Sequence, residues 1–180
     1  MTDDDKIKAI TDSLRDNALG DIKRASSGGA KMGAFILSSC LIDTIAGFMK
    51  GGDTTNADYK CFICKYMSAY NKDDIYTDLR CKLVHSYSEG GSYWFTDNKR
   101  SLHLTKHTDG KTIVNLENFV EEIEAALTAY STDLQNTSNT ALRANAVKRF
   151  DGNGVIQGVQ QNPLVSGGTT NVLPPLSGVS

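Results

Sequence analysis

The sequence lacks an excess of charge of either sign. Its 180 residues carry 19 Lys or Arg against 21 Asp or Glu, which gives a formal net charge of -2 at pH 7. A protein without a basic surplus has no long-range field that attracts nucleic acid. Any contact with RNA would therefore have to rest on a local basic patch.

The sequence also lacks the features of exported and membrane-spanning chains. Residues 1–6 hold three aspartates and one lysine and are acidic overall, whereas a secretion signal begins with a basic segment that an apolar run follows. The most apolar stretch, residues 34–49, is interrupted by Asp43 and is shorter than the roughly 20 residues that a bilayer requires. We therefore expect a cytoplasmic protein with no membrane partner, in which this stretch forms a buried helix.

Cysteine is scarce, and the chain has four: Cys40, Cys61, Cys64 and Cys81. Without a secretion signal we expect reduced thiols rather than disulfides. Cys61 and Cys64 have the Cys-x2-Cys spacing of zinc ligands, but they lie in an apolar helical stretch and no second such pair exists. Free cysteines are commonly buried, so we expect core thiols, no metal site and no cofactor.

The composition is that of a folded domain with a distinct end. Hydrophobic residues make up 39% of the chain and charged residues 22%, values that are ordinary for a globular protein. Residues 152–180 contain no charged side chain and hold all three prolines. We therefore expect a helical domain over residues 1–150, followed by an uncharged tail over residues 151–180. This tail is either flexible or ordered against its own domain or a neighbouring chain.

Apolar periodicity predicts a mainly helical fold. The segment at residues 30–50 is apolar nearly all round and should be the central helix. Asp73 or Asp74 is the expected cap of the fourth helix, and Asn115 is the expected cap of the last. Helices are predicted at residues 4–24, 30–50, 55–69, 73–86 and, with a break near 136–139, 115–150.

The pattern changes to that of β-strands at about residues 92–115. Short alternating or β-rich runs at 93–96, 101–105 and 112–114 are separated by turn residues. They predict a small antiparallel β-meander, which must pack on the helices because isolated hairpins are marginally stable. Aromatic residues gather near it and could stack bases, but such groups more often form core, which is our expectation here. These residues are Tyr87, Tyr93, Trp94 and Phe95.

The predicted fourth helix contains an Arg and a His with four residues between them, Arg80-Cys81-Lys82-Leu83-Val84-His85. In a small helical bundle this spacing resembles the R-x4-H signature of the HEPN superfamily. The run Leu-Val-His-Ser-Tyr, followed by a Gly-rich break and a short hairpin, is similar to bacterial HEPN-like proteins. The resemblance covers roughly residues 30–130. It implies an up-and-down helical bundle, and for active members a metal-independent endoribonuclease that works as a dimer.

The resemblance assigns roles by position. Arg80 would hold a phosphate, since a guanidinium binds phosphate bidentately, and His85 would act as acid or base on a ribose hydroxyl. Lys82, Tyr87 and Asp43 would support them. Catalytic members commonly place a polar residue after the Arg, and Cys81 departs from that pattern.

Two classes of function therefore remain open. One is a HEPN-like endoribonuclease or RNA-binding protein, and the alternative is a non-enzymatic interaction or dimerisation module of the same fold. Residues 60–111 carry nine Lys or Arg against six Asp or Glu and include all three histidines. The part of the chain that holds the motif is thus its most basic part, as a phosphate-binding face requires.

Two contacts are expected around the motif. Asp43 lies on the most apolar helix, where a lone carboxylate is costly, and Arg80 is its natural partner. If the pair is buried, loss of Asp43 should cost about 3 kcal/mol. Residues five apart on a straight α-helix diverge by about 140°, so Arg80 and His85 need a kink or a second chain to meet. We therefore expect a symmetric homodimer with the fourth helix at or beside its interface.

Overall fold

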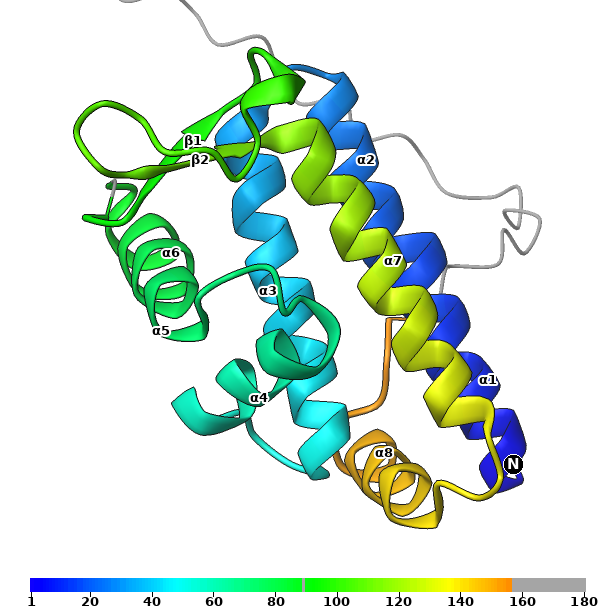
Figure 1. Ribbon diagram of the computed structural model, residues 1–180. Coiled ribbons are helices and arrows are strands. Elements are labelled where there is room, and N and C mark those ends of the chain that lie inside the picture. The colour runs from blue at the N-terminus through cyan, green and yellow to red at the C-terminus, as the bar shows by residue number, and fades with distance from the viewer. Residues whose placement is uncertain (89, 157–180) are drawn as a thin grey trace, which may run out of the picture.

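The computed structural model describes residues 1–88 and 90–156, so most of the predicted tail lies outside the described residues. Helices make up most of the described chain and pack around one central helix (Figure 1). A single hydrophobic core runs through the described residues. The mainly helical prediction is confirmed.

The N-terminal helix is long and contains an irregular turn. It comprises α1 (Asp3–Ser13), the π-helical η1 (Leu14–Leu19) and α2 (Gly20–Ser27). The side chain of Thr2 accepts a hydrogen bond from the Asp5 backbone while Asp5 binds back to Thr2, which satisfies two otherwise unpaired donors. The predicted helix is therefore confirmed, with an added π-helical turn that periodicity did not indicate.

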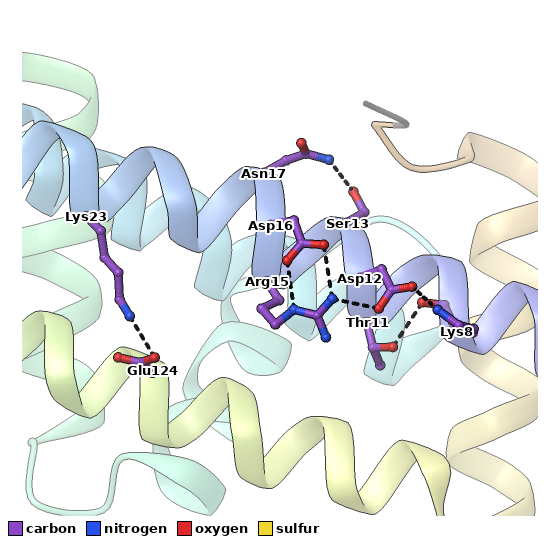
Figure 2. A network of polar contacts seen from close by, with 9 residues as sticks. All are labelled: Lys8, Thr11, Asp12, Ser13, Arg15, Asp16, Asn17, Lys23 and Glu124. Atoms are coloured by element: carbon purple, nitrogen blue, oxygen red, sulfur yellow. Dashed lines mark hydrogen bonds and ion pairs between the residues drawn. The ribbon is translucent and has the colours of Figure 1, made fainter. Parts of the chain in front are cut away.

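Ion pairs tie this helix to itself and to a later one, α7 (Leu116–Gln135) (Figure 2). The guanidinium of Arg15 donates to Asp12 at 2.9 Å and to Asp16 at 2.7 Å. Lys23 reaches across to Glu124 of α7 at 2.7 Å. The two long helices lie side by side, and this exposed pair adds a small cross-link to their apolar contact.

The central helix is α3 (Lys31–Lys50), as predicted. Within the described residues it is the one helix long and apolar enough to cross a bilayer, yet 56% of its most apolar stretch is buried inside the fold. It packs against α2, α4, η2, α7 and α8. It ends where Gly51 takes the left-handed conformation, with φ of 81°, that glycine adopts readily.

The next two helical segments carry the candidate motif. The first, α4 (Asn56–Tyr66), is capped by Thr55. The second consists of α5 (Lys72–Ile75), the π-helical η2 (Tyr76–Leu83) and α6 (Val84–Ser86).

The cap of this second segment was predicted wrongly. Asn71, not Asp73 or Asp74, caps the helix: its side-chain oxygen accepts from the backbone N–H groups of Asp73 at 2.9 Å and Asp74 at 3.2 Å. Asn71 stands directly before the helix, so its side chain reaches the unpaired backbone N–H groups of the first turn. The two aspartates already lie inside that turn.

The predicted antiparallel meander is wrong. Strands β1 (Tyr93–Thr96) and β2 (Thr112–Asn115) pair in parallel, with Trp94 opposite Ile113. The run at 101–105 forms no strand; it begins in the short 3-10 helix η3 (Arg100–Leu102) and then turns at Leu104, whose φ is 58°.

The chain after this turn lies along the other edge of β2. Its N–H at Leu104 donates to the carbonyl of Ile113 at 2.8 Å, and Lys106 forms an isolated antiparallel bridge with Thr112. β2 therefore lies between β1 and the segment that follows Leu104. The alternation of apolar and polar residues in the sequence does not determine this order.

The last two helices are α7 and α8 (Thr140–Asn153). Asn115 caps α7 by accepting from Glu117 at 3.0 Å and Asn118 at 3.2 Å, so the predicted cap and the predicted break between the helices are confirmed. Beyond α8 the carbonyl of Ile156 accepts from Ser13 at 2.7 Å and Asn17 at 2.9 Å. The described start of the uncharged segment therefore lies against the N-terminal helix of its own chain.

A buried carboxylate joins the motif-bearing helix to the sheet. Asp78 on η2 is 1% exposed, and its Oδ2 accepts from the backbone N–H groups of Ser92 and Tyr93, each at 2.8 Å. Gly90 lies directly over this carboxylate, where an added Cβ would come within 1.7 Å of Oδ1. The carboxylate therefore fixes where β1 starts relative to η2.

Replacing Asp78 with Ala should lower the free energy of unfolding by about 3 kcal/mol, because two buried N–H groups lose their acceptor. Asp78→Asn, which keeps one carbonyl oxygen, should lose less. Urea denaturation followed by circular dichroism measures both, and Asp53→Ala on the surface is the matched control. An Asp78→Ala protein as stable as that control would contradict this role.

Candidate functional site

The π-helical turn η2 brings Arg80 and His85 together in one chain. The Val84 N–H donates to the carbonyl of Leu79, five residues back, where an α-helix would use the residue four back. A turn that holds more residues places residue i+5 nearly above residue i. The Nη1 atom of Arg80 accordingly lies 2.6 Å from Nε2 of His85.

The sequence left two ways for these side chains to meet, a kink in the helix or a second chain. The structure shows a departure from the straight α-helix, the π-helical η2, within one chain. Arg80 and His85 therefore meet without a second chain. The homodimer stays a prediction, without this geometric argument for it.

The contact with Arg80 also fixes the form of the His85 ring. A guanidinium has N–H donors and no acceptor, so Nε2 of His85 must accept. An Nε2 that accepts this hydrogen bond belongs to the tautomer with its proton on Nδ1. In the free protein, the nitrogen that would take a proton from a substrate faces the guanidinium of Arg80.

Asp43 holds the other arm of the same guanidinium. Nη2 of Arg80 donates to Asp43 Oδ2 at 3.3 Å, which confirms the predicted contact. The pair is not buried, however, because the Arg80 and Asp43 side chains are 26% and 32% exposed. Partial burial is the largest single influence and lowers the pKa of Arg80, but the hydrogen bond to Asp43 and the attraction of Asp43 and the nearby tyrosines together outweigh it, so the pKa of Arg80 is raised above its usual value.

Aromatic side chains form the buried side of the site. Tyr59 of α4 is fully buried, shares a hydrogen bond of 3.1 Å with Ser39 of α3, and meets the ring of Tyr76 edge-on at 5.4 Å. Burial raises the pKa of Tyr59. These contacts fix η2 against α3 and so fix the distance between Arg80 and Asp43.

The remaining predicted site residues lie on the same segment. Lys82 is exposed, and Tyr87 is 70% exposed with a left-handed φ of 46°. Neither makes a hydrogen bond or ion pair with Arg80 or His85 within the described residues. The structure thus brings together Arg80, His85 and Asp43, and leaves Lys82 and Tyr87 free to meet a ligand.

Several lysines of the chain segment that carries the motif lack an ion-pair partner. Two acids of the same segment are paired with lysines, in Lys60–Asp73 and Lys31–Asp97. Lysines that lack an ion-pair partner within the described part of the chain gather at residues 72–111; they are Lys72, Lys82, Lys99, Lys106 and Lys111. This segment offers the positive charge that phosphate binding requires.

A hollow of about 610 Å³ lies elsewhere, between the N-terminal helix and α7. Its walls hold Lys8, Asp12, Arg15 and Glu124, and all four form ion pairs within the protein. The paired charges leave no surplus of either sign, so this hollow offers no comparable site.

The cysteines differ from their prediction as core thiols. Cys40, Cys61 and Cys64 are exposed, and Cys81 is half-buried. The two cysteines of the Cys-x2-Cys pair lie on the outer side of α4, whose inner side is filled by larger apolar residues. Across residues 1–88 and 90–156, no group of three or more His, Cys, Asp or Glu side chains is placed to hold a metal ion.

Comparison with known proteins adds no neighbour: no family model, no curated protein and no solved structure matches the chain. The resemblance to the HEPN superfamily therefore rests on the R-x4-H spacing and its helical setting.

Because the Asp43–Arg80 pair is about one-third exposed, Asp43→Ala should destabilise the protein by only about 0.5 kcal/mol. Denaturation by urea, with Asp53→Ala as the exposed control, measures this. A loss near the 3 kcal/mol of a buried pair would show that the pair is shielded from water.

The tautomer of His85 gives a second prediction. Nitrogen-15 NMR of the neutral ring should show its proton on Nδ1 and an unprotonated Nε2, and Arg80→Ala should remove that preference because it removes the donor. The signals of His107, whose Nδ1 contacts Asp109 and not Arg80, should not change and serve as the reference within the same spectrum. A protonated Nε2 in the unmodified protein would contradict the contact.

Proposed function

We propose that the protein is a HEPN-like, metal-independent endoribonuclease whose catalytic residues are Arg80 and His85. The observation that carries this proposal is their contact at 2.6 Å within one chain, at a partly exposed position. Neither side chain is covered by the β-strands. Burial of either beneath them would have favoured the alternative.

Arg80 is suited to binding the phosphate of the scissile bond. Asp43 holds Nη2 while Nη1 faces His85, so the guanidinium is oriented before substrate arrives. A phosphate is a stronger acceptor than a neutral imidazole, because charge-assisted hydrogen bonds are the stronger ones. Substrate binding would therefore draw Nη1 onto the phosphate and uncover Nε2 of His85.

His85 is suited to act as the base. Its neutral ring can take the proton of a ribose 2′-hydroxyl, whose oxygen then attacks the neighbouring phosphorus. The bond from phosphorus to the 5′ oxygen breaks, and that oxygen leaves with a proton that balances the one taken up. The products are a 2′,3′-cyclic phosphate and a 5′-hydroxyl, and Arg80 stabilises the charge that builds on the phosphate.

Supporting roles follow from position. Asp43 acts through Arg80 and is a positioning residue. Lys82 and the exposed ring of Tyr87 lie on the same segment and would contact a neighbouring phosphate and base.

The non-enzymatic interaction module is the second candidate. The observation that favours it is Cys81, a half-buried thiol where catalytic relatives of the resembled family commonly carry a polar side chain. Such a module would use the same fold for binding, with Arg80, His85 and Asp43 as a structural cluster. The homodimer predicted from the sequence fits either candidate.

The test is cleavage of a labelled single-stranded RNA by the purified full chain, with and without EDTA. The unmodified protein should cleave in both conditions and leave cyclic phosphate ends. His85→Ala should reduce the rate at least 100-fold, and Arg80→Ala by a similar factor.

The matched control is Lys148→Ala, which removes an exposed charge on α8 and should leave the rate unchanged. Circular dichroism confirms that each variant folds. An absence of cleavage by the unmodified protein, or undiminished cleavage by His85→Ala, would overturn the proposal and favour the interaction module.

A further inference from the structure

The outer face of the two-stranded sheet carries an aromatic surface that the catalytic proposal does not use. Along β1, Tyr93 and Phe95 point into the core, whereas Trp94 and Thr96 are only partly covered. Trp94 lies opposite Ile113 of β2 in the register of the sheet. The prediction that the aromatic residues here form core is therefore correct for Tyr93 and Phe95 and wrong for Trp94, which is partly covered, and for Tyr87, which is exposed.

A hollow of about 440 Å³ opens at this face, within the range of about 300–1,000 Å³ that is common for small-ligand sites. Apolar side chains make much of its wall, with polar groups and one lysine at its edge. Among its lining residues are Trp94, Leu102, His107, Ile113, Asn98 and Lys99. An apolar wall with a few polar groups and a cation suits a planar ligand that carries negative charge nearby.

One carboxylate holds the rings of this surface in place. Asp109 Oδ2 accepts from the indole N–H of Trp94 at 2.8 Å, and Oδ1 pairs with Nδ1 of His107 at 2.9 Å. The hydrogen bond from His107 is the main reason that the pKa of Asp109 is lowered to about 2. The carboxylate is thus ionised at neutral pH, and the two rings, 6.2 Å apart, are oriented before any ligand arrives.

Positive charge surrounds the same surface. The ammonium of Lys111 lies over the Trp94 ring, 4.0 Å from its centre, and Lys99 lines the hollow. Neither lysine has an ion-pair partner within the described residues. Phosphates on a ligand would meet unpaired cations.

We propose that this surface is a binding subsite for a nucleobase of single-stranded RNA, stacked on Trp94, with Lys99 and Lys111 contacting the adjacent phosphates. The proposal deepens the proposed ribonuclease function, on which it rests, by naming single strands as the substrate class. Aromatic platforms flanked by cations bind single strands in this way, because every base has a face that stacks. An aromatic peptide would stack equally well, but the unpaired lysines favour a ligand with repeated negative charge.

The chain contains one tryptophan, so its fluorescence reports on the subsite alone. Titration of the full-length protein with a uridine nonamer should quench this fluorescence in a saturable way. An abasic oligomer of the same length has the phosphates without the bases and should not. Equal quenching by both, or by neither, would overturn the proposal. Quenching by a tyrosine-containing peptide and not by RNA would overturn it in favour of a protein partner.

Variants of the protein test the binding of RNA at this surface without relying on tryptophan fluorescence. In anisotropy measurements with a labelled uridine nonamer, Trp94→Leu should weaken binding about 10-fold, which is the loss of one stacked base. Lys99→Ala should weaken binding and make it less dependent on salt, whereas Lys148→Ala should do neither. Unchanged affinity in Trp94→Leu would contradict the proposal.

The His85→Ala variant separates this proposal from the catalytic one. It should bind and quench as the unmodified protein does while losing cleavage. If the unmodified protein quenches but does not cleave RNA, the subsite stands and the ribonuclease proposal fails. If it cleaves RNA without quenching, the subsite fails and the ribonuclease proposal stands.

Discussion

The candidate site depends on the π-helical backbone of η2, in which the Val84 N–H donates to the carbonyl of Leu79. This backbone holds more residues per turn than an α-helix does, and it places His85 over Arg80. In an ordinary α-helix the same two residues would face different sides, and neither the contact between them nor the fixed form of the His85 ring would exist. π-helical segments are uncommon and are found frequently at functional sites.

Two buried anchors hold this turn in position. On one side the hydrogen-bonded pair of Tyr59 and Ser39 fixes α4 against the central helix, and Tyr59 packs against Tyr76 of η2. On the other side Asp78 binds the start of β1. The Arg80–His85 pair and the proposed base-binding surface around Trp94 are therefore parts of one connected unit, joined through the carboxylate of Asp78, which water does not reach.

This arrangement gives the central helix a double role. Its apolar sides form the middle of the core, and its exposed edge carries Asp43 to the guanidinium of Arg80. A carboxylate at such an edge keeps part of its hydration, so it can orient Arg80 without the large cost of a buried charge. The same partial exposure leaves the guanidinium accessible to a phosphate.

The helices, their order, the cap at Asn115 and the Asp43–Arg80 contact followed from the sequence. Apolar periodicity and capping chemistry are local, and an acid on an apolar helix requires a cation. The parallel pairing of β1 and β2 could not be read in the same way, because four-residue strands give no sign of the path between them.

The π-helical segment η2 could not be predicted from the sequence either. Ile75, Leu79 and Leu83 are spaced by four and all buried, a pattern that fits an α-helix as well as a wider turn. The role of Asp78 was missed because a carboxylate in a charged segment looks exposed. A signal was present in Gly90, since a glycine is needed where the backbone crosses a buried side chain so closely.

The most direct test of this account is the hydrogen-bond pattern of η2 in solution. Couplings transmitted through hydrogen bonds, measured by NMR between amide nitrogen and carbonyl carbon, identify the acceptor of each N–H. The account predicts a coupling between the nitrogen of Val84 and the carbonyl carbon of Leu79. A coupling from Val84 to the carbonyl of Arg80 instead would mean an ordinary α-helix. It would separate Arg80 from His85 and contradict a site that is complete within one chain.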